Sequence, residues 1–529
     1  MKNHRRSLAA LIIGLVALCH SLPAQYVPSA PSRPFPGYIN EALRKNDVYM
    51  SQWDVGVNVR GRAEVKDNAG FTYSGSNADF RAGGVANGIP IDNDNSYFLT
   101  RVMPRVGYTE KWYSFLVEAR SSASVDDERG DLRVAADRAA NGKTYRGNDL
   151  AENDRDLNIH QAFATFGNHK EFPLSLKVGR QELVYGDQRL VGHLRWNNNA
   201  RTFDAVKARY QNRYVGADVF AGGLVYNDNQ NFNQSHPQDD LFSGVYLNFP
   251  NLGEFTQKNV VEAYYLNRNV ERSSATVDLR GTTPYSGVPL PFRNPAVQDL
   301  STVGLRIKSK PGATGAWDYS AELIHQFGER ATTAPAAAST AVRTAKLLDQ
   351  DAYAAILGAG YTWTDLAWQP RAGFVYSYAS GDENIADGKS GTFQNLFATT
   401  HLHYGFMDLN SLQNLHDIRL VFQAKPRTNI SFSLEHHFQF LDTNNDYWYN
   451  VAGVARNGGA YADALTRSGS NELGQETDFV ISWNPIPSTQ LELGLSHYFR
   501  GDYIKETLAN DVGGSKDSSY AYFQVTVSL

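Results

Sequence analysis

The feature that most constrains the fold of this chain is the alternation of apolar and polar residues at every second position. In residues 52–60 the odd positions are Trp53, Val55, Val57 and Val59, whereas the even positions are polar or glycine. Successive side chains of a β-strand point to opposite faces, so the pattern describes a strand with one apolar and one polar face. The last ten residues, 520–529, repeat the pattern up to the terminal leucine.

Sixteen further segments between these two show the same period, which gives eighteen predicted strands. They are 97–108, 112–121, 157–167, 174–185, 201–210, 213–226, 240–249, 259–268, 300–309, 316–327, 350–363, 370–379, 416–425, 429–440, 475–483 and 489–500. Apolar residues recurring at this period, in runs of this length, indicate strands rather than helices.

The connections between the strands alternate between short and long. The short ones are 109–111, 168–173, 211–212, 250–258, 310–315, 364–369, 426–428 and 484–488, and the longest are 64–96, 122–156, 269–299, 380–415 and 441–474. Short periplasmic turns, long extracellular loops and an even strand number are typical of outer-membrane barrels, whereas a β-sandwich would not sort its connections in this way. We therefore predict an all-β fold, a transmembrane antiparallel β-barrel of about 18 strands.

Composition excludes several other classes of protein. Mean hydropathy is −0.43, and past the N-terminus no apolar run reaches the roughly 18 residues that a membrane-spanning helix needs. A single cysteine excludes a disulfide framework and a cysteine-based metal site. The net charge of −5 gives no basic excess for a nucleic-acid surface.

The N-terminus predicts export from the cytoplasm. Positive residues precede the apolar stretch from Leu8 to Cys19, and Ala24 offers a small residue for cleavage. We expect three parts: a signal peptide at 1–24, a Pro-rich periplasmic lead-in at 25–48 and the barrel at 49–529. The expected location is the outer membrane of a Gram-negative bacterium, where membrane lipid surrounds the barrel.

Alternation also predicts which charged side chains face the lumen. The basic ones singled out are Arg60, Arg62, Arg101, Arg105, Arg120, Lys207, Arg209, Arg306, Arg371 and Arg419, and a late acidic group comprises Glu476, Asp478 and Glu492. Arginine suits bidentate recognition of carboxylates, and a ring of arginines in a pore selects anions. The alternative is that these charges pair across strands and only stabilise the wall.

Other chemistries find little support in the sequence. The inward aromatics Tyr214, Phe220, Tyr246 and Tyr264 would either stack on sugar rings or fill space near the wall. His325 and His497 share the outward parity of their strands, which suits a membrane interface, and no histidine lies in a nucleophile motif. The stretch 442–446 fits an outer loop better than a calcium loop, because position six would need glycine. We expect no enzyme, cofactor or metal, and neither an adhesin nor a plugged transporter is specified.

One stretch points to a particular family. Val178-Gly179-Arg180-Gln181-Glu182-Leu183 leads into a run from Tyr185 to Gly192, then Trp196-Asn197-Asn198, then a run from Arg201 to Val206. This GRQEL, YGDQRLVG, WNN and RTFDAV series resembles the alginate-export family of outer-membrane barrels. A weaker second likeness lies in Ser380-Gly381-Asp382, Gly391-Thr392-Phe393 and 403–408.

The resemblance implies a monomeric barrel whose arginine-rich constriction passes an anionic uronate polysaccharide or oligosaccharide. It implies that the following residues shape the pore wall: Arg180, Glu182, Asp187, Arg189, Arg195 and Arg201. Plain alternation, however, gives Arg180 the outward parity of Val178, unless a bulge at Gly179 reverses it. The alternative function is a general or sugar-uptake porin. Periplasmic export proteins are candidate partners.

Overall fold

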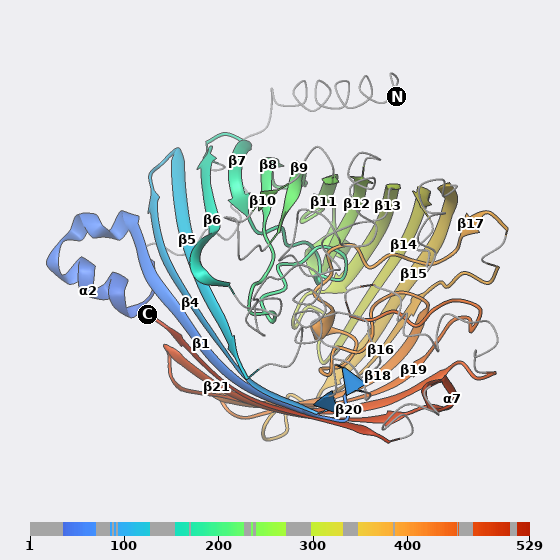
Figure 1. The fold of residues 1–529 in the computed structure, drawn as a ribbon. Coiled ribbons are helices and arrows are strands. Elements are labelled where there is room, and N and C mark those ends of the chain that lie inside the picture. Colours follow the sequence, from blue (N-terminus) through green and yellow to red (C-terminus); the bar gives the residue numbers. More distant parts are fainter. Residues whose placement is uncertain are drawn as a thin grey trace.

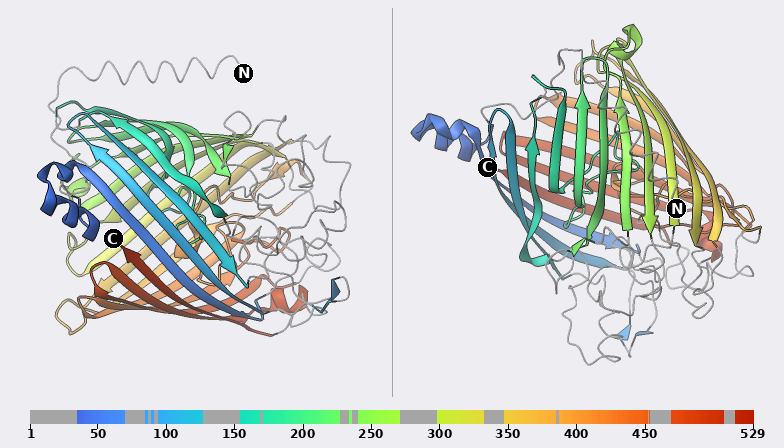
Figure 2. Two further views of the ribbon diagram at one scale, coloured as in Figure 1. Left: turned by 60° about the vertical axis from the view of Figure 1, so that its left-hand side comes forward. Right: turned by 90° about the horizontal axis from the view of Figure 1, so that it is seen from above.

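The alternating segments pair into one closed antiparallel ring of 18 strands, shown in Figures 1 and 2 for the computed structural model of the chain. The structure describes residues 35–69, 85–86, 89–90, 94–126, 154–168, 171–226, 234–235, 240–270, 298–331, 347–384, 387–451, 453, 469–507 and 516–529. The expected signal peptide lies outside these residues.

Each of the eighteen predicted segments corresponds to one strand of the ring. In order they are β1 (Trp53–Asp67), β4 (Asn95–Thr109), β5 (Tyr113–Val125), β6 (Asp154–Phe166), β7 (Leu174–Gln181), β8 (Phe203–Gln211), β9 (Gly216–Tyr226), β11 (Asp240–Asn248), β12 (Asn259–Val270), β13 (Gln298–Ser309), β14 (Trp317–Ala331), β15 (Leu347–Thr362), β16 (Arg371–Ala379), β18 (Leu415–Arg427), β19 (Ile430–Phe440), β20 (Glu472–Ile486), β21 (Thr489–Arg500) and β22 (Ser518–Ser528). The barrel and its strand number are confirmed.

Short elements complete the described chain. They are the strands β2 (Val85–Ala86), β3 (Ile89–Pro90), β10 (Gln234–Ser235) and β17 (Lys389–Ser390), the helices α2 (Tyr38–Asn46), α4 (Glu254–Lys258) and α7 (Asp502–Thr507), and the 3-10 turns η2 (Val48–Gln52) and η4 (Thr400–Leu402). None of the helices in the described part of the chain is long and apolar enough to cross a membrane.

Pairing of the first strand with the last closes the ring. β1 and β22 are in register from Asn58 opposite Ser528 to Asp67 opposite Ser519. The terminal Leu529 continues the ladder, since its amide donates to the carbonyl of Val57 at 2.9 Å. Closure leaves no strand edge unpaired, which the hydrocarbon core of a membrane requires.

Burial along the strands is inverted relative to a water-soluble protein. On β1, Arg60, Arg62 and Glu64 are buried, at 4%, 1% and 3% exposure, whereas Val59 and Val65 are 38% and 51% exposed. The polar set therefore faces the interior of the ring and the apolar set faces outward. An outward apolar band is the surface that lipid covers.

The part of the N-terminal lead-in that the structure describes contains a helix. Within residues 35–48, α2 occupies 38–46 and packs beside the start of β1. The side-chain oxygen of Asn40 accepts a hydrogen bond from the amide of Val55 at 2.8 Å, and its amide group donates to Asp54. Val55 is the third residue of β1, which begins at Trp53. Its hydrogen bond to Asn40 therefore attaches α2 to the periplasmic end of the strand. Figure 2 shows α2 beside the C-terminus.

Two connections turn into the ring instead of extending beyond it. The strand predicted to reach residue 185 ends at Gln181, and residues 182–202 form the β7–β8 segment. Residues 380–414 form the β16–β18 segment, which contains β17 and η4. Figure 1 shows both running inside the ring of strands. The alternation of the strands gives no information on the direction that a loop takes.

The topology predicts which turns reagents reach from outside the cell. Asn445 is exposed in the long connection after β19, and Thr428 is exposed in the short turn between β18 and β19. We expect a membrane-impermeant maleimide to label Asn445→Cys on intact cells and to label Thr428→Cys only after the outer membrane is opened. Labelling of Thr428→Cys on intact cells would invert the topology.

Candidate functional site

The β7–β8 and β16–β18 segments bind each other inside the barrel. Val191 and Phe397 form a parallel bridge. The amide of Gly192 donates to Phe397 at 2.9 Å, the amide of Phe397 donates to Leu190 at 2.8 Å, and Thr399 donates to Gln188 at 2.9 Å. This short backbone ladder joins two connections that are about two hundred residues apart in the chain, so the two segments form one unit across the lumen.

A stack of rings forms the second contact between the segments. The ring of Trp196 lies on that of His401, with centroids 3.7 Å apart and an interplanar angle of 8°. Phe406 stacks on His401 at 4.9 Å. Asp408 bonds Nδ1 of His401 at 3.0 Å, which orients the ring. Trp196 belongs to the WNN motif. The alternation of residues along the strands does not predict its contact with His401.

The early arginines bind the backbone of the β7–β8 segment. Arg60 and Arg101 both donate to the carbonyl of Arg195, at 2.8 and 2.9 Å. Arg62 donates to the carbonyl of Trp196 at 2.9 Å, and Arg120 donates to that of Asn199. We call Arg60, Arg62, Arg101 and Arg120 the carbonyl clamp.

The clamp residues are covered by the segment that they bind. Their exposed fractions are 4%, 1%, 4% and 2%, in chain order. The guanidinium of Arg62 also lies 3.7 Å over the ring of Trp196 and bonds Glu64 at 2.6 Å. These side chains point to the interior of the ring, where they contact the β7–β8 segment.

Arg195 lies at the centre of this region and remains accessible. Its side chain is 34% exposed and pairs with Glu182 at 2.7 Å and Glu118 at 3.4 Å. His160, which is fully buried and was not predicted, bonds the same carboxylate of Glu182 at 2.9 Å. Burial alone would raise the pKa of Glu182, but the hydrogen bond from His160 and the charge of Arg195 outweigh it and lower the pKa to about 2.

Asp187 connects the β7–β8 segment to the opposite wall. Its carboxylate pairs with Arg306 at 2.6 Å and with Lys308 at 3.0 Å. These bonds and charges overcome the effect of burial and depress the pKa of Asp187. The Asp187 carbonyl lies 2.8 Å from Nε2 of His403 in the second segment. Arg306 also pairs with Glu262, so Asp187, which the resemblance implied would shape the pore wall, lies in a network of ion pairs.

Arg189 and Arg201 hold the two segments together. Arg189 is 7% exposed and donates to the hydroxyl of Tyr404 at 3.2 Å. Arg201 donates to the carbonyls of Phe397 and Ala398, the latter at 3.0 Å. Burial lowers the pKa of Arg201 to about 9, with the charge of Arg268 as a second cause. Both side chains thus bind the chain's own loops.

The remaining cations predicted in the lumen pair with acids on other strands, which are adjacent strands except for Arg371, whose partner Asp318 lies two strands away on β14. The pairs are Arg105 with Asp54 at 3.1 Å, Lys207 and Arg209 with Asp218 at 3.6 and 3.2 Å, Arg371 with Asp318 at 2.6 Å and Arg419 with Glu435 at 3.2 Å. Their side chains keep between 13% and 26% exposure. Cross-strand pairing, the alternative left open by the sequence, therefore applies to every one of them.

Arg180 does not lie where the family resemblance placed it. β7 pairs with β6 and β8 without a register shift, so alternation continues through Gly179. Arg180 then shares the outward parity of Val178, which is 38% exposed, and pairs with Asp204 directly across β8 at 2.8 Å. The placement of Arg180 in the pore wall is therefore corrected: it faces outward, as plain alternation indicated.

Two of the predicted inward aromatics, Tyr246 and Tyr264, pack at the wall in a stack of rings. Tyr246 and Tyr264 stack at 5.4 Å with an angle of 6°, and Tyr185 stacks on Tyr246 at 4.5 Å. The hydroxyls of Tyr246 and Tyr264 donate to Glu262 and Glu322. Tyr246 and Tyr264 are only 7% and 6% exposed, so their faces contact other rings of the protein and not the open lumen.

Other predicted features of the loops take structural roles. Asp446, in the stretch that was weighed as a calcium loop, accepts from the amide of Asp382 at 3.0 Å, from Thr392 at 2.6 Å and from Tyr449 at 2.8 Å. In the late acidic group, Glu476 accepts from the amide of Met407 at 2.7 Å. Among the described residues, no three His, Cys, Asp or Glu side chains gather in a way that could hold a metal ion.

Comparison with known structures shows barrels of the same fold at low sequence identity. Pseudomonas aeruginosa OccD3 (OpdP) is 8% identical, with a TM-score of 0.50 over 90% of this chain and 91% of that one. P. aeruginosa OccK5 (OpdH) is 10% identical, with a TM-score of 0.49 over 90% and 98%. P. aeruginosa OccK2 (OpdF) in complex with glucuronate is also 10% identical, with a TM-score of 0.49 over 90% and 96%.

Comparison at the sequence level identifies the family. No curated protein sequence matches the chain. The family model described as alginate export matches residues 93–513, which include β4 to β21 and both inward segments. Together with the closed ring of strands, this match indicates a channel in the outer membrane of a Gram-negative bacterium and not an enzyme. The chain belongs to the alginate-export family.

Proposed function

We propose that this channel passes an anionic, carboxylate-bearing saccharide, an alginate-like uronate polymer or oligomer. One observation carries the proposal: the lumen is crossed by a segment that presents a partly exposed guanidinium, Arg195, within a cluster of positive charge. Around the segment lie five guanidiniums, those of the carbonyl clamp and of Arg195, and three carboxylates, those of Glu64, Glu118 and Glu182. The charge of this cluster is therefore net positive.

The field of a few charges at a narrow point can decide which ions pass, whatever the net charge of the chain. Exposed acids on outer loops are screened within about 8–10 Å at physiological ionic strength. A solute that passes Arg195 meets its charge at short range, with less water between them. Because Arg195 already binds two carboxylates, a uronate carboxylate would find a guanidinium oriented for the same chemistry.

Two further expectations belong to this proposal. The protein would act as a monomer, as the family resemblance implies. Export of a polymer would require periplasmic export proteins to deliver it to the rim where α2 lies.

A general or sugar-uptake porin is the second candidate, and a group of acidic side chains on β18 and β20 favours it. Asp417, Glu476 and Asp478 on β18 and β20 are fully buried, and His437 pairs with Asp417 at 2.8 Å. These side chains make this part of the lumen acidic in composition, whereas the carbonyl clamp makes its part basic. The charge selectivity of the open channel distinguishes the two candidates.

Selectivity in planar bilayers is the first test. We expect the wild-type channel to favour anions and to be blocked by oligouronates added to one side. Arg195→Ala should lower the anion-to-cation permeability ratio by about twofold or more, because it removes the partly exposed cation of the cluster. Arg371→Ala, which removes a cation paired on another part of the wall, is the matched control and should change the ratio less. A cation-selective wild-type channel, or a current that oligouronates never block, would contradict the uronate proposal and favour the general porin.

The carbonyl clamp should set the width of the channel. In Arg60→Ala/Arg101→Ala the carbonyl of Arg195 loses both guanidinium donors, each hydrogen bond of this charged type contributing about 1.5–3 kcal/mol. We expect the β7–β8 segment to move and the single-channel conductance to rise and become noisier. Arg105→Ala, on the same wall but bonded to Asp54, should keep the wild-type conductance. Equal conductance in all three proteins would contradict the clamp.

Acid should release the β7–β8 segment through Glu182. The pKa of this carboxyl is depressed from 4.5 to about 2, so its ion pair stabilises the segment fully above about pH 4.5. That contribution is lost as the pH falls through the folded-state pKa near 2. We expect conductance to change over this window in the wild type and to stay flat in Glu182→Gln. The same acid response in both proteins would assign it to another group.

A further inference from the structure

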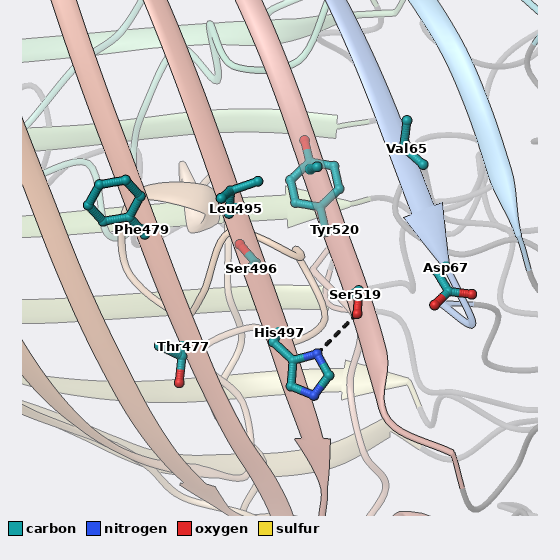
Figure 3. Close-up of a pocket in the computed structure, with 10 residues that line it drawn as sticks. Val65, Asp67, Thr477, Phe479, Leu495, Ser496, His497, Ser519 and Tyr520 are labelled. Carbon is teal, nitrogen blue, oxygen red and sulfur yellow. Dashed lines mark hydrogen bonds between the residues drawn. The ribbon is translucent and has the colours of Figure 1, made fainter.

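On the outer face of the barrel, five adjacent strands each contribute one polar residue to a single cross-strand row. In order from β19 to β1, these residues are His436, Thr477, His497, Ser519 and Asp67, and each is the register partner of the next. We call them the outer polar row. His436 bonds Thr477 at 2.8 Å and His497 bonds Ser519 at 3.0 Å, the second of which is drawn in Figure 3.

The next outward row toward the periplasm is entirely apolar. It runs Leu434, Phe479, Leu495, Ala521 and Val65, again as consecutive register partners. Leu434, Leu495 and Val65 are 43%, 45% and 51% exposed. A polar row directly above an apolar row, at the end of the strands that bear the long loops, is the arrangement expected where lipid headgroups meet acyl chains.

A groove crosses this boundary over β22. Ser519 and Ala521 are small, and they lie between Leu495 on one side and Val65 on the other, so the surface is hollowed to about 410 Å³ (Figure 3). Further along β22 the exposed Phe523 ends the run of small residues. The floor and sides of the groove are apolar, and its polar residues lie at the end nearest the outer polar row.

We propose that this groove binds one acyl chain of a phosphorylated lipid of the outer leaflet, with the lipid headgroup at the outer polar row. His497 uses Nδ1 for Ser519, so Nε2 is the ring nitrogen available to a headgroup. Lys516 lies beside the row, since its carbonyl accepts a hydrogen bond at 2.8 Å from Asn68, the residue after Asp67. His497 and Lys516 would face the phosphate, and Ser519 and Thr477 the headgroup hydroxyls.

The position of the groove determines the occupant. It lies on the outward face of a membrane barrel, continuous with the exposed apolar band, so lipid covers it rather than a soluble partner. A free phosphate or sugar would leave the apolar floor wet, and a simple alkane would leave the polar end unused. An amphiphile with a chain below and a phosphorylated head above meets both requirements.

The test uses the full-length folded barrel in detergent, with lipid A as the probe and native mass spectrometry as the readout. We expect one lipid A bound to the wild type. Ala521→Phe should weaken binding about tenfold or more, because filling the groove keeps at least two methylenes in solvent. Ala208→Phe places the same ring at an exposed, outward position on β8 and should bind as the wild type does. If Ala521→Phe does not fold, Ala521→Leu takes its place.

Headgroup variants separate the possible lipids. His497→Ala/Lys516→Ala should weaken binding of lipid A and leave binding of dephosphorylated lipid A unchanged. The proposal is overturned if Ala521→Phe binds lipid A as the wild type does, or if Ala208→Phe loses binding equally. Equal binding of lipid A and its dephosphorylated form would overturn the phosphate assignment. Equal binding of phosphatidylethanolamine would overturn the assignment to an outer-leaflet lipid.

Discussion

The hydrogen-bonded seam between β1 and β22 is the contact on which the rest of this structure depends. A strand edge in hydrocarbon has no water to bond, so a sheet in a membrane is stable only when its ends meet. The seam runs over ten register pairs from Asn58 to Asp67, and the terminal Leu529 extends it. Once it is closed, every second residue of each strand must face the interior. Closure therefore turns alternation along the chain into an inner and an outer surface.

An interior lined by charged side chains has to satisfy them, and this barrel does so with its own backbone. The guanidiniums of the clamp carry more N–H donors than the nearby carboxylates can accept. Carbonyls of the β7–β8 segment accept those donors, and the segment in turn gains a fixed position across the lumen. Because a buried donor or acceptor without a partner is costly, the arginines and the segment stabilise each other. The sequence predicted that these arginines would bind a solute. In the structure they bind carbonyls of the protein's own β7–β8 segment.

The strands could be predicted from the sequence because a strand's face depends only on the parity of its residues. All eighteen segments and the short turns follow from that local rule, as does the outward parity of Arg180. Segments that are distant in the chain decide which side chains or backbone groups cover an inward residue. A local sequence pattern therefore does not predict this contact. Arg60 and Arg62 were predicted to face the lumen, yet nothing in the pattern of β1 indicates that Trp196 lies over them. His160 was missed for the same reason, since its partner Glu182 lies on the segment.

The family motif gains a physical meaning once the segment is seen as one unit. Arg180 and Asp204 face each other across β7 and β8 just before the chain leaves the sheet, and their ion pair ties the two strands together at that point. Next to them, Gln181 is fully buried and bonds the carbonyl of Ala205 at 2.9 Å. The GRQ and TFD portions of the motif therefore hold the base of the segment. The WNN portion supplies the ring of Trp196 and one carbonyl that the clamp holds, and the flanking residues Arg195 and Asn199 supply the other carbonyls. The motif residues therefore fix the position of the β7–β8 segment inside a wide barrel. A fixed segment holds the guanidinium of Arg195 at a defined place in the lumen.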